Sequence, residues 1–211
     1  MLIFDFFSGT GSATKAFTDA GDTVIHFEIN RSLPADDRSD LLMVTGQELV
    51  EKYGRPDFIW ASPPCTSFSV ASVANHWMRE GDEYVPISES ASYGRLLAMR
   101  TVQLMYEIDP KLGFAIENPR GLMRKMPFMQ DLERFTIHYC QYGDNRQKPT
   151  DIWGVIPNWI PRPVCSPGAS CHEPAPRGSH GGTQRLNGAK ERSELPEGIS
   201  IDIREALEME L

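Results

Sequence analysis

A cysteine stands directly behind two consecutive prolines in the segment ASPPCTSFS, residues 61–69. Each proline fixes its own φ angle, lacks a backbone amide proton and keeps the preceding residue out of the helical region. We therefore expect the preceding strand to stop at Ala61 or Ser62 and a stiff, non-helical loop to present Cys65. A thiol held in this way is suited to act as a nucleophile. The alternative is a buried cysteine with a purely structural role.

A carboxylate and an amide end a second apolar run. Glu117 and Asn118 follow the residues GFAI and precede a proline. If both runs are strands of one parallel sheet, Glu117 lies at the same edge as Cys65, and ligands of open parallel sheets bind at that edge. The alternative is an acidic side chain in a surface turn.

A glycine loop near the start of the chain is a candidate cofactor site. The segment FFSGTGS places Gly9 and Gly11 between an apolar run and a helical pattern. Such a loop can lay a cofactor against backbone amides at a helix start, although it can also be only a tight turn. Glu28 follows at the end of the next apolar run, where an acidic side chain can bind the two hydroxyls of a ribose. Asp40, ahead of LLMVT, could hold the exocyclic amine of adenine. The loop has no third glycine and no P-loop lysine, which argues against a nucleoside triphosphate.

Basic side chains are concentrated in one part of an acidic chain. The net charge is −8, yet residues 118–192 carry 11 basic and 6 acidic side chains. This segment is a candidate face for phosphates, or it reflects chance clustering on a solvated surface. Within it, Arg146 and Lys148 flank a turn in HYCQYGDNRQKPTDIWG. They either hold an anion near the site or are simply solvated.

Three soft metal ligands lie close together in the segment VCSPGASCHEPAP. They are Cys165, Cys171 and His172. A structural zinc site needs a fourth ligand, which Cys140 or a histidine elsewhere in the chain could supply. The spacing is not a standard zinc motif, and the alternative is a local turn with small apolar thiols.

Strands alternating with helical segments must position these residues, and this alternation predicts an α/β fold with a parallel sheet and crossover helices. The expected strands lie within 1–7, 22–30, 55–62, 113–119, 134–143 and 151–155. Helices are expected after the glycine loop up to Gly21, before Gly54, and over 87–108. Residues 70–84 are polar and mixed and predict a mobile loop. Residues 156–192, rich in proline and glycine, predict an irregular lobe, and residues 197–211 a closing helix.

The totals are those of one globular domain. The chain has 211 residues, of which 40% are hydrophobic, which is enough for a core. No run approaches the length of a membrane helix, and the first residues resemble a strand more than a signal peptide. Four cysteines in a chain of this size do not form a disulfide framework. We therefore expect a reduced, cytoplasmic protein.

The motifs occur in a recognisable order. FDFFSGTGS, then Glu28, ASPPCTSFS, IENPRG and YGDNRQKPTDIW together resemble the cytosine-5 DNA methyltransferase family over residues 1–154. The tail APRGSHGGTQRLNGAKERSELP resembles short methylases encoded by bacteriophages, so a bacterial host cytoplasm is the implied location. The resemblance implies a Rossmann-like sheet with helices on both faces and S-adenosylmethionine as cofactor. It also implies three segments: a catalytic and cofactor-binding domain (1–154), a small recognition lobe (155–192) and a helix that packs back on the catalytic domain (193–211).

The resemblance also implies roles for individual residues. Cys65 would attack carbon 6 of a flipped-out cytosine, Glu117 would hydrogen-bond its ring nitrogen 3 and amine, and Arg146 would bind its carbonyl, with Lys148 as a rival. The implied cofactor-binding residues are Phe7, Gly9, Thr10, Gly11, Ser12, Glu28, Asp40 and Pro63. The implied substrate-binding residues are Pro64, Ser69, Asn118, Lys148, Arg177 and Arg185.

The chain departs from the family pattern in its recognition region. Family members usually have a large target-recognition region between the basic motif and the C-terminal motifs, whereas here only residues 155–192 stand in that place. The usual C-terminal Gly-Asn motif is not evident. The resemblance implies double-stranded DNA as partner, and the small region suggests a short or degenerate target site, a homodimer or an accessory recognition protein. Two alternatives remain: the same chemistry on a pyrimidine nucleotide or RNA, and a catalytically degenerate relative that binds DNA or a protein.

Overall fold

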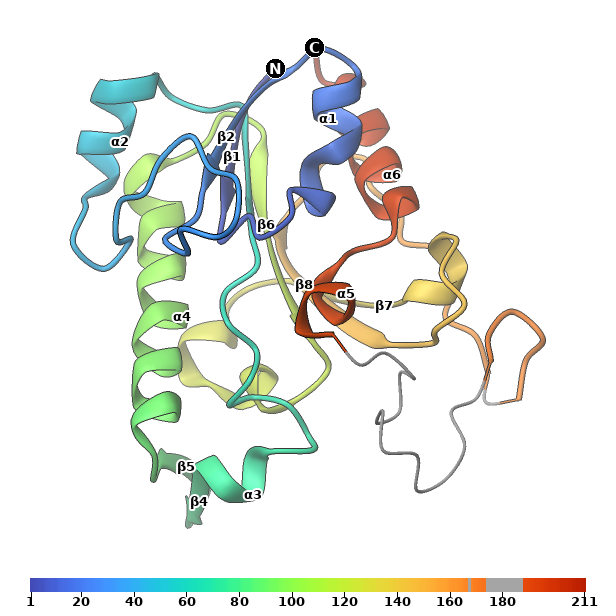
Figure 1. The fold of residues 1–211 in the computed structure, drawn as a ribbon. Helices are drawn as coiled ribbons and strands as arrows, with labels where there is room; N and C mark the ends of the chain where they lie inside the picture. Colours follow the sequence, from blue (N-terminus) through green and yellow to red (C-terminus); the bar gives the residue numbers. More distant parts are fainter. Residues whose placement is uncertain (167, 174–187) are drawn as a thin grey trace.

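A mixed sheet forms the centre of the molecule. The computed structural model describes residues 1–166, 168–173 and 188–211. In the described residues the sheet has six strands in the order β2-β1-β3-β6-β8-β7 (Figure 1). They are β1 (Leu2–Phe6), β2 (Thr23–Phe27), β3 (Phe58–Ala61), β6 (Gly113–Pro119), β7 (Arg134–His138) and β8 (Pro149–Val155). Each lies within a predicted strand segment or overlaps one.

The sheet is only partly parallel, which corrects the expectation of a fully parallel sheet. β1, β2, β3 and β6 pair in parallel, whereas β8 runs antiparallel to both of its neighbours, β6 and β7. The physical reason is the connection between β7 and β8. It contains only residues 139–148, including the 3₁₀ helix η4 (Tyr139–Tyr142), and this is too short for the crossover that a parallel pair needs.

Helices cover both faces of the sheet, as expected for this fold class. α1 (Lys15–Asp19) and α6 (Glu197–Glu208) lie on one face, and α2 (Gly46–Tyr53) and α4 (Glu89–Ile108) on the other (Figure 1). Alternate side chains of β1 pack into different cores: Phe4 and Phe6 face α2 and α4, while Ile3 packs with residues of α1 and α6. The fold is therefore Rossmann-like.

Local signals explain where the longest helix begins and ends. α4 starts after Ser88, whose hydroxyl accepts a hydrogen bond from the amide of Ala91 at 3.1 Å, as a capping residue does. It ends at Ile108 because Asp109 adopts a left-handed conformation with φ 51° and Pro110 follows. The predicted helix over 87–108 is thus confirmed.

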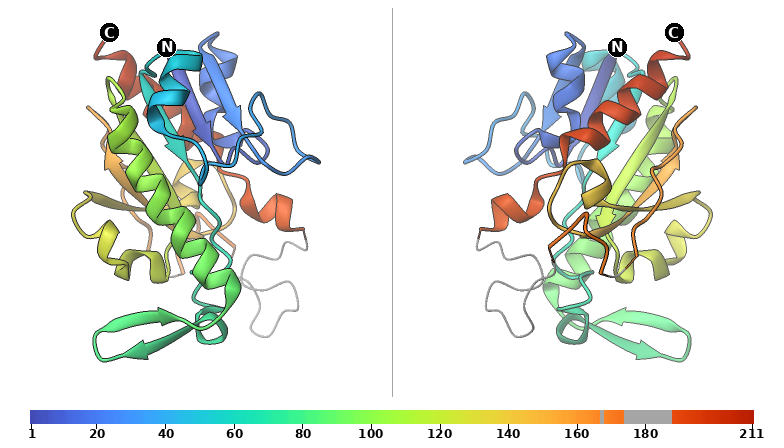
Figure 2. Two further views of the ribbon diagram at one scale, coloured as in Figure 1. Left: turned by 90° about the vertical axis from the view of Figure 1, so that its left-hand side faces the viewer. Right: turned by 90° about the vertical axis from the view of Figure 1, so that its right-hand side faces the viewer.

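The segment expected to be a mobile loop contains regular structure instead. α3 (Val73–His76) is followed by an antiparallel hairpin of β4 (Trp77–Glu80) and β5 (Glu83–Pro86). The hairpin extends beyond the end of α4 in both side views (Figure 2). Gly81, with φ 60°, supplies the turn. Trp77 anchors the hairpin, because its buried ring packs on Phe68 and its Nε1 donates to the carbonyl of Ser67 at 2.8 Å. One buried side chain among charged residues gives little sequence signal.

The C-terminal helix returns to the start of the chain. The hydroxyl of Ser200 in α6 accepts a hydrogen bond from the amide of Ala16 at 3.1 Å, and Arg204 pairs with Asp22 at 2.8 Å. The two ends of the chain consequently lie near each other (Figure 1). Among the described residues, none of the helices has the length and apolar character that spanning a bilayer would require.

Candidate active site

The double-proline loop begins where β3 ends. β3 stops at Ala61, so the predicted end of this strand is confirmed. The amide nitrogen of the Asn118 side chain donates to the carbonyl of Pro63 at 2.9 Å. This buried bond joins the loop to the end of β6 and fixes the half-buried Cys65 near that strand.

Glu117 lies beside this loop. Ala61 is paired with Ile116 in the sheet, so Glu117 is level with the first residue after β3. Burial raises the pKa of the Glu117 carboxyl, while the ammonium group of Lys148 opposes the rise. Burial also raises the pKa of Cys65, and a charged Glu117 raises it further. The structure therefore brings the predicted nucleophile and the predicted carboxyl group into one electrostatic environment.

Lys148 is the basic residue that faces this pair. Its buried ammonium group donates to the hydroxyl of Tyr139 at 3.1 Å and to the backbone carbonyl of Arg192 at 2.8 Å. The hydroxyl of Tyr139 in turn lies 3.5 Å from Oε1 of Glu117. The positive charge of Lys148 lowers the pKa of Cys65, and burial lowers the pKa of Lys148 itself. Tyr139 was not predicted, because an aromatic residue after a strand is usually part of a core.

Arg146 is held differently. Its guanidinium is paired with both carboxylate oxygens of Asp144 and lies 5.6 Å from the centre of the Tyr139 ring. The pairing with Asp144 raises the pKa of Arg146, so the group stays charged but largely neutralised. Of the two basic residues predicted for the pyrimidine carbonyl, Lys148 is therefore the one with a charge directed at Glu117 and Cys65.

A cavity of about 250 Å³ lies at the carboxyl ends of β1, β2 and β3. This is the point where the strand order reverses, the usual ligand site of such sheets. Of the predicted cofactor-binding residues, Phe7, Glu28 and Asp40 line the cavity. Seven other wall residues were not predicted from the sequence. They are Phe27, Ile29, Ser39, Leu41, Ser62, Tyr93 and Leu97. Pro64, predicted to bind substrate, also lines it.

Hydrogen bonds orient the two acidic side chains of this cavity. The Glu28 carboxylate accepts from the amides of Gly9 at 3.1 Å and Asn30 at 2.8 Å. Asp40 accepts from the amide of Leu42 at 3.0 Å. Each carboxylate keeps lone pairs that a ligand hydroxyl or amine can use.

The glycine loop lies next to the cavity, and residues from other parts of the chain hold it in place. Gly11 has φ 75°, and an added Cβ would come within 3.3 Å of the His26 ring, so only glycine suits this position. Ser12 accepts a hydrogen bond from the amide of Leu195 at 3.1 Å. Five predicted cofactor-binding residues are not among those that line the described cavity: Gly9, Thr10, Gly11, Ser12 and Pro63.

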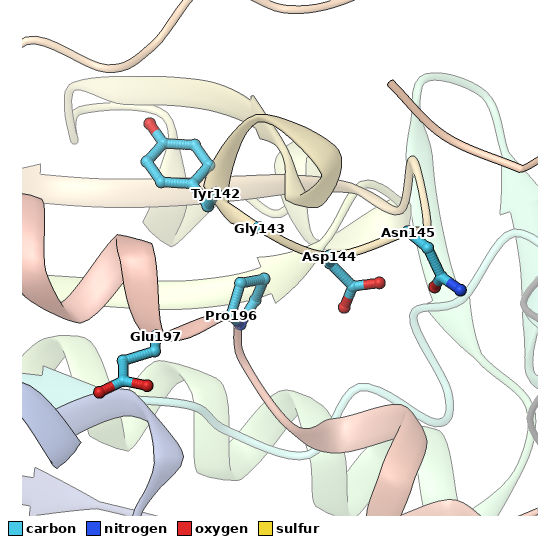
Figure 3. Close-up of a pocket in the computed structure, with 6 residues that line it drawn as sticks. All are labelled: Tyr142, Gly143, Asp144, Asn145, Pro196 and Glu197. Carbon is cyan, nitrogen blue, oxygen red and sulfur yellow. The ribbon is translucent and has the colours of Figure 1, made fainter. Parts of the chain in front are cut away.

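The remaining predicted substrate residues are in different places. The amide of Ser69 donates to the carbonyl of Cys65 at 3.1 Å, so Ser69 lies in the turn that follows the cysteine. Arg177 and Arg185 lie outside the described residues. A broader depression of about 620 Å³ is lined by Tyr142, Gly143, Asp144, Asn145, Pro196 and Glu197 (Figure 3). It is lined by none of the residues predicted for catalysis or cofactor binding, so we place the chemistry at the smaller cavity.

The four predicted metal ligands converge at a separate place. The ligand atoms of Cys140, Cys165, Cys171 and His172 all lie within 4.8 Å of one another. Cys140 belongs to η4, while the other three come from the loop after β8. The long spacing between them hides this cluster from a motif search.

Comparison with known proteins finds a curated viral relative. A curated relative from Frog virus 3 (isolate Goorha), named "Probable DNA (cytosine-5)-methyltransferase", is 29% identical over 184 residues, which cover 81% of this chain and 78% of the relative. Models of protein families give no match.

Three solved methyltransferase structures align with this chain at TM-scores below 0.5. A mutant DNMT2 from Spodoptera frugiperda aligns with TM-score 0.46 and 16% identity over 73% of this chain and 49% of its own. The Dnmt2 methyltransferase of S. pombe aligns with TM-score 0.48 and 13% identity over 74% and 49%. A SAM-dependent methyltransferase from Agrobacterium tumefaciens gives TM-score 0.38 and 16% identity over 74% and 55%.

This chain thus spans about half the length of those solved proteins. The viral relative is matched over most of both chains. The double-proline loop and Glu117, which the sequence predicted to share one edge of the sheet, do lie at the same edge, next to the cavity. The chain is therefore similar to a viral protein named as a probable DNA cytosine-5 methyltransferase.

Proposed function

We propose that this protein methylates carbon 5 of cytosine in double-stranded DNA, on a base flipped out of the duplex, through a covalent bond to Cys65. The observation that carries the proposal is the shared environment of Cys65, the buried Glu117 and Lys148 next to a cavity of nucleoside size. The viral relative is named for DNA, and the basic part of the chain, residues 118–192, provides charge for phosphates.

The cavity fits the nucleoside part of S-adenosylmethionine. Its walls combine apolar side chains with two oriented carboxylates. Glu28 would accept from the ribose hydroxyls, since backbone amides already hold its carboxylate in place. Asp40 would accept from the adenine amine. When bound, the cofactor supplies an electrophilic methyl group on a sulfonium centre.

The residues around Cys65 suit the activation of a poor nucleophile. Carbon 5 of cytosine becomes nucleophilic only after a thiolate adds to carbon 6, because the addition creates an enamine. Cys65 would form that bond, and the displaced electron pair would move toward ring nitrogen 3. A protonated Glu117 would donate to this nitrogen, and Lys148 would donate to the carbonyl at carbon 2. After methylation, solvent water would take the carbon 5 proton, the double bond between carbons 5 and 6 would re-form with expulsion of the Cys65 thiolate, and ring nitrogen 3 would return its proton to Glu117.

Neighbouring residues would hold this arrangement in place. Asn118 fixes the double-proline loop through its bond to Pro63, so we assign it a positioning role. Ser69 and Pro64 would contact the flipped nucleotide, and Arg177 and Arg185 would contact phosphates. Tyr139 links Glu117 to Lys148 and would keep both groups at the base.

A methyl-transfer assay with three substrates tests the proposal. Purified protein and tritiated S-adenosylmethionine are incubated with duplex DNA, with tRNA or with dCMP. We expect label only in duplex DNA, at carbon 5 of cytosine. Label in tRNA or in dCMP alone would overturn DNA as the substrate.

Calorimetry with S-adenosylmethionine tests whether the protein binds the cofactor at all. We expect the wild type to bind. Glu28→Ala should bind about tenfold or more weakly, because a hydrogen-bonded contact to the ribose is lost. Absence of binding by the wild type would favour a catalytically degenerate relative.

Lys148 and Arg146 form a matched pair of basic residues for a second test. We expect Lys148→Met to lower kcat roughly 10²-fold, since a buried charge directed at the reacting base is lost. Arg146→Met should lower it less than about tenfold, because Asp144 already neutralises that guanidinium. Single-turnover rates at saturating DNA and cofactor give the comparison, with melting temperatures as the control for folding. The opposite order of effects would return the carbonyl-binding role to Arg146.

A further inference from the structure

The cluster of Cys140, Cys165, Cys171 and His172 has the dimensions of a tetrahedral metal site. Zinc bonds of about 2.3 Å to sulfur and 2.0–2.1 Å to nitrogen place sulfur atoms about 3.8 Å apart and sulfur and nitrogen about 3.6 Å apart. Here the Cys140 sulfur lies 3.4 Å from Cys165 and 3.6 Å from Cys171. The Nδ1 atom of His172 lies 3.6 Å from the Cys165 sulfur and 3.5 Å from the Cys171 sulfur.

These separations do not correspond to disulfides. A disulfide holds its sulfur atoms about 2.05 Å apart, and all four cysteines of the chain are free. Three sulfurs and one imidazole nitrogen are also the donor set of a closed structural zinc site. The reduced setting predicted from the cysteine content is the one in which such ligands persist.

Side-chain amides surround the sulfur atoms. The Nε2 atom of Gln141 donates to the sulfurs of Cys171 at 3.3 Å and Cys140 at 3.6 Å. The Nε2 atom of Gln147 donates to Cys165 at 3.4 Å. Donors directed at three sulfurs are what metal-bound thiolates need, because such outer contacts orient the ligands and stabilise their charge.

The cluster joins two parts of the chain that are separate in the sequence. Cys140 stands in η4, next to Tyr139 of the active site, while the other three ligands stand in the loop over residues 165–172. Among the described residues, the amide of Ala169 donates to the carbonyl of Ser166 at 3.1 Å, and that of Cys165 to Nδ1 of His138 at 3.2 Å. The amide of the adjoining Glu173 donates to the carbonyl of Asn145 at 2.9 Å. A metal ion would therefore fasten the loop to η4.

We propose that Cys140, Cys165, Cys171 and His172 bind one structural zinc ion that anchors the loop after β8 to η4. This site is distinct from the methyl-transfer site and does not depend on the proposed function. Its ligands are partly exposed, so the ion is accessible to chelators. Zinc would hold Cys140 and thereby the neighbouring Tyr139, whose hydroxyl contacts both Lys148 and Glu117.

Metal analysis of the purified full-length protein is the first test. We expect about one zinc ion per chain after gel filtration in metal-free buffer. After chelation and addition of Co²⁺, the wild type should show the sulfur-to-cobalt charge-transfer bands and the visible bands of tetrahedral cobalt. Protein that binds neither metal, or that contains a disulfide between two of these cysteines under reducing conditions, would overturn the proposal. Because these measurements use the wild type, they do not depend on any variant folding.

The fourth cysteine of the chain provides a matched control. Cys171→Ser and His172→Ala should lower the zinc content at least about tenfold after dialysis against a weak chelator, since each removes one of four ligands. Cys65→Ser should retain the full zinc content, because Cys65 is not part of the cluster. Limited proteolysis should cut residues 156–173 faster in both ligand variants and in chelated wild type. Zinc retained by both ligand variants, or lost only in Cys65→Ser, would contradict the assignment.

Discussion

Replacing Cys65 with alanine is expected to abolish methyl transfer while leaving cofactor binding intact. Without the sulfur, carbon 5 of cytosine is never made nucleophilic, so the rate should fall on the order of 10⁴-fold or more. The cofactor cavity is lined by Phe7, Glu28 and Asp40 and not by Cys65, so the affinity for S-adenosylmethionine should change little. Single-turnover transfer to duplex DNA and calorimetry with the cofactor measure the two effects.

Trapping of the covalent adduct makes this prediction sharper. A DNA duplex with 5-fluorocytosine in place of cytosine has a carbon–fluorine bond that the enzyme cannot break to release the base. After methyl transfer, the wild type should therefore remain attached to this DNA through Cys65, and mass spectrometry should identify that residue. Cys65→Ala should form no adduct. An active Cys65→Ala protein, or an adduct on another cysteine, would show that the nucleophile is assigned wrongly.

Replacing Glu117 with glutamine is the second change with a large expected effect. The variant loses the acidic proton that would stabilise the addition step, and we expect kcat to fall about 10²- to 10³-fold near neutral pH. Glutamine has nearly the same volume, so folding should be preserved. Stopped reactions with saturating cofactor and DNA measure kcat, and circular dichroism checks the fold.

The pH dependence distinguishes a proton donor from a structural carboxyl group. The reactive form needs Cys65 as thiolate and Glu117 protonated, and burial raises the pKa of both groups. Below the pKa of Glu117 the rate rises with pH as thiolate forms. Between the pKa of Glu117 and the pKa of Cys65 the rate stays level, because the gain in thiolate is offset by loss of the Glu117 proton. Above the pKa of Cys65 the rate falls, because no more thiolate forms while the protonated fraction of Glu117 keeps decreasing.

In Glu117→Gln only the thiol titrates. The rate should then rise with pH until Cys65 is ionised and show no decline at higher pH. Cys65 should also ionise at lower pH than it does in the wild type with a charged Glu117, because the carboxylate that raises the pKa of Cys65 is gone. A Glu117→Gln profile with the same alkaline decline as the wild type would show that Glu117 does not supply the proton.

The sequence predicted the parts of the site that backbone chemistry determines. Two prolines end a strand wherever they occur, so the position of Cys65 after β3 could be predicted. The same applies to Glu117, because it ends an apolar run before a proline. The choice between Arg146 and Lys148 could not be predicted, since it depends on the ion pair of Arg146 with Asp144 and on a φ of 26° at Lys148.

Features that depend on tertiary packing were missed. Tyr93 and Leu97 line the cavity at the carboxyl ends of β1, β2 and β3 from α4, yet a helical pattern shows only that one face is apolar. The β4–β5 hairpin depends on the contact between Trp77 and Phe68, two residues in a polar stretch. The reversed direction of β8 follows from a short connection whose ends the sequence pattern did not locate.

The reversed strand also sets a lower limit on the length of the chain that follows it. β8 begins near Lys148 at the catalytic edge and ends at Val155 on the opposite edge, about 20 Å away for seven residues. Residues 156–164 must travel back the same distance to bring Cys165 beside His138 at the end of β7. The ten Cα-to-Cα steps from Val155 to Cys165 reach about 34 Å when the chain is extended, so this return path has slack for the loss of only about four residues. Versions of this segment that lose more residues than this slack cannot keep both the antiparallel strand and the cysteine cluster, whereas longer versions can keep both.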